Sequence, residues 1–311
     1  MSLKIRDVAT SLLFPEGPVA MADGSVLLVE IEGGTLTRVA ASGEVQRIAE
    51  LGGGPNGLAI GPDGAAYVCN NGGMFFSSAD DGTRRPGHQP DDYSGGRIER
   101  VDLRTGRVER LVEQVEGVAL RGPNDIVFDA AGGCYFTDLG KVRPDEIDRG
   151  GVFYLPAGAG SAQRVAYPAM TPNGVGLSPD GRTLYYAETE GARLWAFDVL
   201  APGVVRRDAW PSPHGGRMVV ASPGGHYQRF DSMALDVLGN IYIGTLLHGG
   251  ITIVSPDGTV CRHVSLPDRY PTNLCFGGPD MRTLYVTLSG SGKLVAIDDW
   301  PVPGLRLHHA A

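Results

Sequence analysis

The sequence predicts an all-β protein, a six-bladed β-propeller with four antiparallel strands per blade. Three observations predict this fold: one hairpin unit recurs six times, no segment has a convincing helical period, and turn residues are abundant. The 311 residues include 46 Gly and 22 Pro, spread evenly along the chain, as many short strands joined by tight turns require. We therefore expect one propeller domain that spans residues 1–311.

The recurring unit is a polar residue, a short apolar strand, a turn often of the type P-D-G, and a second strand. Its copies occupy residues 16–29, 56–68, 124–136, 173–186, 231–243 and 273–286. Two further strand-like runs usually follow each copy, such as GGRIERVD and GRVERLVE after the second one. The last copy supplies only three strands, and we predict that the N-terminal stretch KIRDVAT adds the fourth and closes the ring.

The gap between the second and third copies is the largest one, and it contains an insertion over residues 70–96 that is rich in Gly, Asp and Ser. Long loops in compact domains are usually functional or disordered, and we expect this one to form a lid or a wall of a substrate site. Phe75, Phe76 and Tyr93 are the candidates for an apolar part of that wall.

Composition and charge narrow the class of protein. The formal net charge is −8 without any Lys/Arg cluster, which argues against a nucleic-acid or anionic-membrane partner. No signal-peptide pattern and no long apolar stretch occurs, so we expect a cytoplasmic protein. The four cysteines form no C-x-x-C pair, and all but Cys261 are expected to be small buried apolar residues.

The first residue of each copy carries the strongest functional signal. The first strand of each propeller blade lines the central channel, so one register of these strands forms a ring. Asn is depleted in strands, and its repetition at this register indicates a functional ring. The alternative is that these residues only cap the turn before each strand. The ring residues are Glu16, Asn56, Asn124, Asn173, Asp231 and Asn273.

The chemistry of the ring points to a metal. All six side chains bear oxygen, two of them are carboxylates, and neither His nor Cys is among them. Carboxylate and amide oxygens bind hard cations, so the ring predicts a divalent metal site. Ca²⁺ is the first choice, with Zn²⁺, Mn²⁺ and Fe²⁺ as alternatives.

Several segments resemble the senescence marker protein / gluconolactonase / luciferin-regenerating enzyme family of six-bladed propellers. They read FPEGPVA, GGPNGLAIGPDG, GPNDIVFD, TPNGVGLSPDGRTLYYAET, FDSMALDVLGNIYI and PTNLCFGGPDMRTLYVT, and they span essentially the whole chain. The resemblance implies metal ligation by Glu16, Asn173 and Asp231, with Asn124 as a fourth ligand or a substrate contact. The Glu, Asn, Asn, Asp set is also similar to the diisopropyl fluorophosphatase branch.

This resemblance implies a metal-dependent hydrolase that opens a lactone, a sugar lactone or a related cyclic ester, in the central channel. Asp231 is the candidate catalytic base or nucleophile, and Glu16 is expected to bind metal only. The alternatives are a phosphotriester hydrolase of the diisopropyl fluorophosphatase type and a non-enzymatic, metal-stabilised binding propeller.

A small-molecule substrate would be contacted by ring residues and by two side chains outside the ring. In sugar-lactonase members an Arg lies two residues before the Asn of the third blade, whereas this chain has Gly122 there and an Arg one residue earlier. His248, at the end of a strand of the fifth blade, is the best-placed histidine, and His214 and His226 are weaker candidates. The expected substrate contacts are Asn56, Asn124, Asn273, Arg121 and His248.

Overall fold

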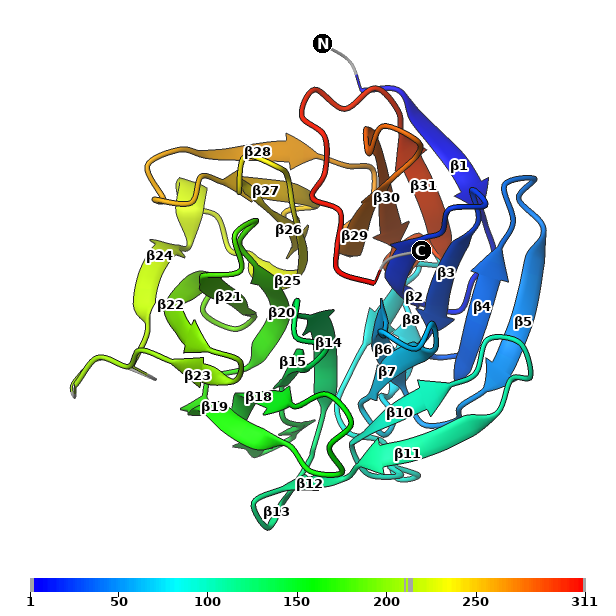
Figure 1. Cartoon of the computed structure of the whole chain (residues 1–311). Helices are drawn as coiled ribbons and strands as arrows, with labels where there is room; N and C mark the ends of the chain where they lie inside the picture. Colours follow the sequence, from blue (N-terminus) through cyan, green and yellow to red (C-terminus); the bar gives the residue numbers. More distant parts are fainter. Residues whose placement is uncertain (1–2, 210, 212–214, 310–311) are drawn as a thin grey trace.

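The protein is a six-bladed propeller, as the sequence predicts. The structure, a computed structural model, describes residues 3–209, 211 and 215–309. Six antiparallel sheets surround a central channel, and their first strands β2, β6, β14, β20, β25 and β29 lie nearest the centre (Figure 1). No helix in these described ranges is long and apolar enough to cross a membrane.

The first three blades follow the predicted hairpin copies, and each adds two outer strands. Blade 1 contains β2 (Pro15–Ala20), β3 (Val26–Glu30), β4 (Thr35–Val39) and β5 (Val45–Glu50). Blade 2 contains β6 (Pro55–Ile60), β7 (Ala66–Asn70), β10 (Arg97–Val101) and β11 (Val108–Val112). Blade 3 contains β14 (Pro123–Phe128), β15 (Cys134–Asp138), β18 (Gly150–Leu155) and β19 (Gln163–Ala169).

The other three blades have the same order of strands, with one addition in blade 4. Blade 4 contains β20 (Pro172–Leu177), β21 (Thr183–Glu188), β22 (Arg193–Ala201) and β24 (Arg217–Ala221), and the short β23 (Val204–Val205) pairs with the far end of β22. Blade 5 contains β25 (Arg229–Leu235), β26 (Ile241–Leu246), β27 (Gly250–Val254) and β28 (Cys261–Ser265). Blade 6 contains β29 (Pro271–Gly277), β30 (Thr283–Leu288) and β31 (Lys293–Ile297).

The N-terminal strand completes blade 6. Strand β1 (Ile5–Ala9) pairs antiparallel with β31, so that Ile5 lies opposite Ile297. The first and last strands of the chain therefore share one sheet, which confirms the predicted closure. Closing the ring in this way covers the edge that β31 would otherwise expose.

The apolar core lies between neighbouring blades. Ile98 of blade 2 packs against Phe136 and Phe153 of blade 3, and the two Phe rings stack with centroids 5.4 Å apart. Ile251 of blade 5 and Val286 of blade 6 belong to another such cluster. Each large side chain buried in this way contributes about 1.5–3 kcal/mol, so six interfaces of this kind hold the blades at fixed angles around the channel.

The free cysteines follow the expected pattern of burial. Cys69 and Cys134 are buried in blades 2 and 3, and Cys275 is partly buried in blade 6. Cys261 is exposed in the outer strand β28.

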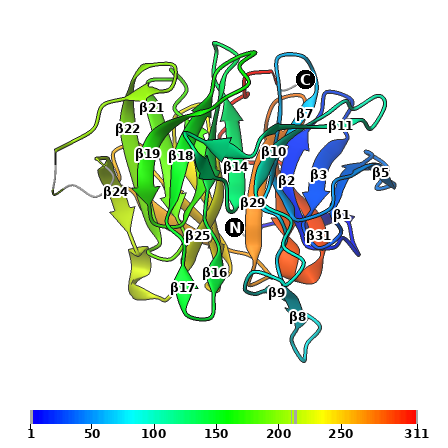
Figure 2. The same ribbon diagram turned by 90° about the horizontal axis from the view of Figure 1, so that it is seen from below.

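Two hairpins project from the propeller on one face. The insertion forms β8 (Phe76–Ser78) and β9 (Arg84–Pro86), and the β15–β18 connection forms β16 (Val142–Arg143) and β17 (Glu146–Ile147). Figure 2 shows both hairpins on the side opposite the C-terminus. The insertion packs back onto the ring of blades: Phe76 contacts Phe14 with ring centroids 4.9 Å apart.

The C-terminal segment closes the other face of the channel. Leu305, Arg306 and Leu307 line the channel together with apolar side chains of the first strands, such as Leu177 and Phe276. Figure 1 shows this segment, in red, crossing the centre of the ring. The pocket that these residues line has a volume of about 90 Å³.

Candidate metal centre

The six ring residues occupy equivalent positions near the start of the first strand of each blade. All six side chains are buried, with exposed fractions between 2% for Glu16 and 7% for Asp231. Polar residues are seldom buried without a partner or a function, so this repeated burial indicates a function for the ring.

The strand pairing is irregular next to the ring in every blade, as it is at a β-bulge. The pairing of each first strand with its second strand shifts register within about two residues of the ring position. In blade 1, for example, the shift lies between Glu16 and Val19. Bulges re-aim a side chain out of the normal strand alternation and are common next to active sites. Here six of them act at the same level of the channel.

Glycines next to the ring let the first strands approach closely. Gly17, Gly57 and Gly174 follow the ring residues of blades 1, 2 and 4. A Cβ at Gly57 would lie 2.4 Å from the backbone oxygen of Asn124, and one at Gly174 would lie 2.7 Å from that of Asp231. No side chain fits at such distances, so glycine is required for the strands to converge and bring the ring side chains together.

The ring is joined across the closure between blades 6 and 1. The Asn273 side-chain nitrogen donates a hydrogen bond of 2.8 Å to Glu16 Oε2. The same oxygen accepts one of 2.7 Å from the backbone nitrogen of Gly17. Two donors thus hold the Glu16 carboxylate in place at the channel.

The two middle asparagines differ in their hydrogen bonding. Asn173 donates through its nitrogen to Thr189 Oγ1 at 3.0 Å, and its oxygen accepts from Ser232 at 3.4 Å. Asn124 Oδ1 is buried and has no hydrogen-bond partner among the described residues. An unsatisfied buried acceptor costs about 1–3 kcal/mol and calls for an explanation such as an ion or a water.

Three carboxylates share this buried region. Burial raises the pKa of Glu16 to about 7, against the effect of its hydrogen bonds. Burial, followed by the charge of Glu16, raises the pKa of Asp231 well above its usual range. Asp125, directly after Asn124, also has its pKa raised to about 7, mainly by burial and partly by the charge of Glu16. Mutual repulsion in a low dielectric favours protonation, and a cation among the carboxylates would reverse it.

The residues of the ring fit a divalent cation. Glu16, Asn124, Asn173 and Asp231 offer two carboxylates and two amide oxygens, and one of these oxygens is unpartnered. This donor set is typical of Ca²⁺ sites. The described parts of the chain contain no group of three or more His, Cys, Asp and Glu side chains that could hold a metal.

Asp125 connects blade 3 to blade 4 behind the ring. Its carboxylate accepts hydrogen bonds from the backbone nitrogens of Ile126 at 3.0 Å and Val175 at 3.1 Å. Asp125 therefore fixes the spacing between Asn124 and Asn173, the ring residues of these two blades.

Threonines near the end of second strands also support the ring, and the sequence analysis missed them. Thr137 Oγ1 donates to the backbone oxygen of Asn173 at 2.6 Å and accepts from the nitrogen of Asp125 at 3.0 Å. Thr287 Oγ1 bonds the backbone of Asn273 within blade 6, accepting from its nitrogen at 3.0 Å and donating to its oxygen at 3.1 Å. Their signal was present, because YFTD and YVTL place a Thr at the same point of two hairpin copies.

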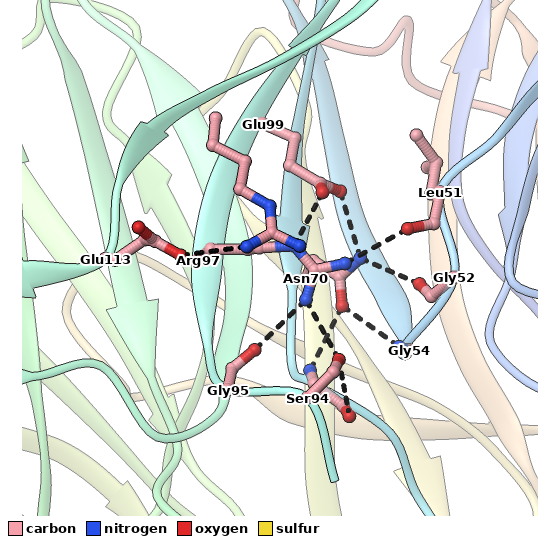
Figure 3. A network of polar contacts seen from close by, with 11 residues as sticks. Leu51, Gly52, Gly54, Asn70, Ser94, Gly95, Arg97, Glu99 and Glu113 are labelled. Carbon is pink, nitrogen blue, oxygen red and sulfur yellow. Dashed lines mark hydrogen bonds and ion pairs between the residues drawn. The ribbon is translucent and has the colours of Figure 1, made fainter. Parts of the chain in front are cut away.

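A buried network anchors both ends of the insertion beside the ring (Figure 3). The Arg97 and Glu99 side chains, each 2% exposed, form an ion pair of 2.6 Å. Asn70 donates to Glu99 at 2.9 Å and accepts from the backbone nitrogens of Gly54 and Gly72 at 2.9 and 3.0 Å. This network fixes the approach to ring residue 56 and the start of the insertion.

A small pocket lies beside the ring on the hairpin-bearing face. It holds about 60 Å³ and is lined by Asn56 and Asn124 together with Asn71, His88 and Lys141. The Lys141 side chain is 5% exposed. Asn71 and Lys141 could not be singled out from the sequence, because both lie in connections that do not repeat from blade to blade.

The two predicted contacts outside the ring, Arg121 and His248, are both exposed. Arg121 is exposed, and its backbone oxygen accepts a hydrogen bond of 2.7 Å from the Tyr93 hydroxyl. The backbone nitrogens of Arg121 and Gly122 both donate to Asp138 at 2.7 Å, which fixes this turn. The described lining of the pocket beside the ring includes Gly122 and Lys141 but not Arg121.

His248 is exposed and belongs to a row of three histidine rings at blade 5. Its ring lies 4.7 Å from that of His226 and 4.2 Å from that of His263, centroid to centroid. His214 lies outside the described residues.

The fold and site define a propeller with an oxygen-bearing ring in its channel. Residues 14–290 match the family described as the SMP-30/Gluconolactonase/LRE-like region, and the chain belongs to this family.

Individual relatives agree with the family. The chain is 26% identical over 316 aligned positions to a gluconolactonase from Zymomonas mobilis subsp. mobilis, covering 93% of this chain and 80% of the relative. It is 27% identical to a 6-deoxy-6-sulfogluconolactonase from Pseudomonas putida, covering 68% of this chain and 83% of the relative. The crystal structure of regucalcin from Agrobacterium tumefaciens str. C58, a calcium-binding protein, has a TM-score of 0.74 with 20% identity and covers 98% of both chains. At that identity the structural match shows the shared fold.

Proposed function

We propose that this chain is a divalent-metal-dependent hydrolase that opens a lactone at the ring, with Ca²⁺ as the first choice of metal. The observation that carries the proposal is the buried ring itself, in which Glu16 and Asp231 lie with an unpartnered oxygen of Asn124. The lactonase names of two relatives support the class of substrate.

Four ring residues would hold the metal: Glu16, Asn124, Asn173 and Asp231. When bound, a divalent metal polarises an ester carbonyl and stabilises the negative charge that forms on its oxygen. The hydrogen bonds that Asn273 and Thr189 make to ring side chains keep the ligands oriented without substrate. Asn56 and Asn273 complete the ring as contacts to water or substrate.

Asp231 is the group that we assign to the chemical step. As a base, its carboxylate takes a proton from the water that attacks the lactone carbonyl. The proton is then returned to the ester oxygen of the lactone as its C–O bond breaks. As a nucleophile, it would attack the carbonyl itself, and water would then hydrolyse the resulting anhydride. Both routes yield the open hydroxy acid.

The insertion supplies the wall of the site. Its Asn71 and His88 lie in the pocket beside the ring, and the Arg97–Glu99 network fixes its two ends. A wall at this position limits the water that reaches the ring and selects the substrate by shape.

The test compares substrate classes on one preparation. Protein loaded with Ca²⁺, Mn²⁺ or Zn²⁺ is offered sugar lactones, aliphatic lactones and diisopropyl fluorophosphate, and acid release is followed with a pH indicator. The proposal expects the highest kcat/KM on a lactone. Preference for the phosphotriester would replace it with the alternative hydrolase. No turnover of any substrate by protein with bound metal would favour a binding propeller.

A further inference from the structure

Lys141 is a buried cation in the wall of the proposed active site. It follows β15 in the turn before the β16–β17 hairpin, and its side chain is 5% exposed. Its Nζ donates to the backbone oxygen of Gly73 at 2.6 Å and to Asn71 Oδ1 at 3.2 Å, and it lies 5.2 Å from the centre of the Tyr93 ring. An ammonium has three N–H groups, so two acceptors leave one donor over.

No carboxylate among the described residues forms an ion pair with Lys141. Two acidic side chains lie near enough to raise its pKa, but both are already engaged. The Asp138 carboxylate accepts backbone hydrogen bonds from Arg121, Gly122 and Gly140. The Asp148 carboxylate pairs with Arg143 at 2.5 Å. Neither carboxylate forms a direct ion pair with the ammonium, and a buried charge that lacks such a contact is costly, so the position favours an anion that binds from outside the chain.

Asn71 adds a second donor at the same place. Its oxygen accepts from Lys141 and from the backbone nitrogen of Gly73, which turns its amide nitrogen to the other side. That nitrogen is buried and has no hydrogen-bond partner among the described residues. Two residues that are in contact, Asn71 and Lys141, therefore each have an N–H group without an acceptor, as the binding of an oxyanion requires.

The position of these donors connects them to the ring. Lys141 and Asn71 line the same pocket as Asn56 and Asn124, with the exposed His88 at its edge. The volume of about 60 Å³ exceeds the space that one water needs and suits a small substituent. Burial lowers the pKa of Lys141 to about 8, so the amine is still mostly protonated at pH 7.

We propose that Lys141 and Asn71 form a subsite for a carboxylate or another oxyanionic substituent of the substrate, so that this enzyme prefers lactones that carry a negative charge. The inference rests on the proposed lactonase function and names the substrate class of that site. A neutral hydroxyl would accept a hydrogen bond from Nζ but would leave the buried ammonium without a direct ion pair.

The test uses two lactones that differ only in this substituent. D-Glucaro-1,4-lactone carries a carboxylate where D-glucono-1,4-lactone carries a hydroxymethyl group. For the metal-loaded protein, we expect kcat/KM to be higher for the glucarolactone. Lys141→Met should lower this value about 10- to 100-fold more for the glucarolactone than for the gluconolactone, because it removes one charge-assisted contact. Lys293→Met, which changes an exposed lysine paired with Asp7 in blade 6, is the matched control and should lower neither preferentially.

The outcomes separate this subsite from the lactonase function. An equal loss on both lactones, or no loss, overturns the proposed subsite while leaving the hydrolase intact. If neither lactone is hydrolysed, the lactonase proposal fails, and calorimetric binding to the metal-loaded protein decides the subsite. Tighter binding of the glucarolactone that is lost in Lys141→Met supports it, and equal binding of both overturns it. Lys141→Gln replaces the Met variant if thermal unfolding shows that the latter does not fold.

Discussion

Replacing Glu16 by Gln should change the stability of the protein in opposite directions with and without metal. The substitution keeps the shape of the side chain and an oxygen that accepts from Asn273, but it removes one of the buried negative charges. The pKa of Glu16 is raised from 4.5 to about 7, mainly by burial. At about 1.36 kcal/mol per pKa unit, its ionisation at pH 8 costs the metal-free protein about 3 kcal/mol.

Metal-free Glu16→Gln protein should therefore be more stable than the wild type at pH 8, by up to about 3 kcal/mol. Saturating metal reverses the order, because a ligand at 100 times its Kd adds about 2.7 kcal/mol to the wild type and less to a variant that binds it weakly. Urea unfolding at pH 8, in chelator and in excess Ca²⁺, measures both values.

Glu99→Gln is the matched control, because Glu99 is equally buried but is paired with Arg97. Removing it strands the buried Arg97 charge and should destabilise the protein by about 3–5 kcal/mol with or without metal. The reasoning is refuted if Glu16→Gln is less stable than the wild type in chelator, or if Ca²⁺ stabilises both proteins equally.

Three further outcomes follow from the site. The metal-free protein should lose stability as the pH rises from about 4.5 through 7, because folding raises the pKa values of Glu16 and Asp125 and so disfavours their charged forms. Ca²⁺ should flatten this dependence of stability on pH. A rise in the stability of the metal-free protein over the same range would contradict the prediction. Asp231→Asn should lower kcat by about 10²- to 10⁴-fold in protein whose bound metal is verified by elemental analysis, and activity near the wild-type value would remove Asp231 from the chemical step. Thr137→Val should lower the free energy of unfolding by about 1–3 kcal/mol, since it leaves the backbone nitrogen of Asp125 unpaired. The control Thr259→Val, in an exposed turn, should change this free energy by less than about 0.5 kcal/mol. Thermal unfolding measures both values.

The propeller could be predicted because its signal is local and repeated. Each hairpin copy carries its own strand alternation and turn. The stretch KIRDVAT belongs to no copy, so it could be assigned as the missing fourth strand of blade 6. The ring register followed from the same repeat, since equivalent positions in six copies must lie at one level of the channel. The bulges that aim these side chains leave no mark in a pattern of apolar and polar residues, because they depend on pairing between strands.

The other residues of the site lie outside the repeated hairpins, so the repeat could not predict their positions. Lys141 and Asn71 meet across some 70 positions of sequence, in two connections with no counterpart in other blades. Arg121 was suggested by the family resemblance, and its role as a substrate contact stays a prediction; backbone hydrogen bonds to Asp138 fix its turn, and the residue is exposed. The crossing of the channel by the C-terminal segment could not be predicted from the sequence either, because Leu305 and Leu307 lie beside strands that are remote in sequence.

The measurement that tests the central claim most directly is a titration of chelator-treated protein with Ca²⁺ in which bound metal and lactone hydrolysis are recorded on the same samples. The account predicts one functional metal per chain, hydrolysis that rises in proportion to its occupancy, and loss of both in Glu16→Gln. Hydrolysis at full rate by protein without bound metal, or tight stoichiometric binding that Glu16→Gln leaves unchanged, would contradict it.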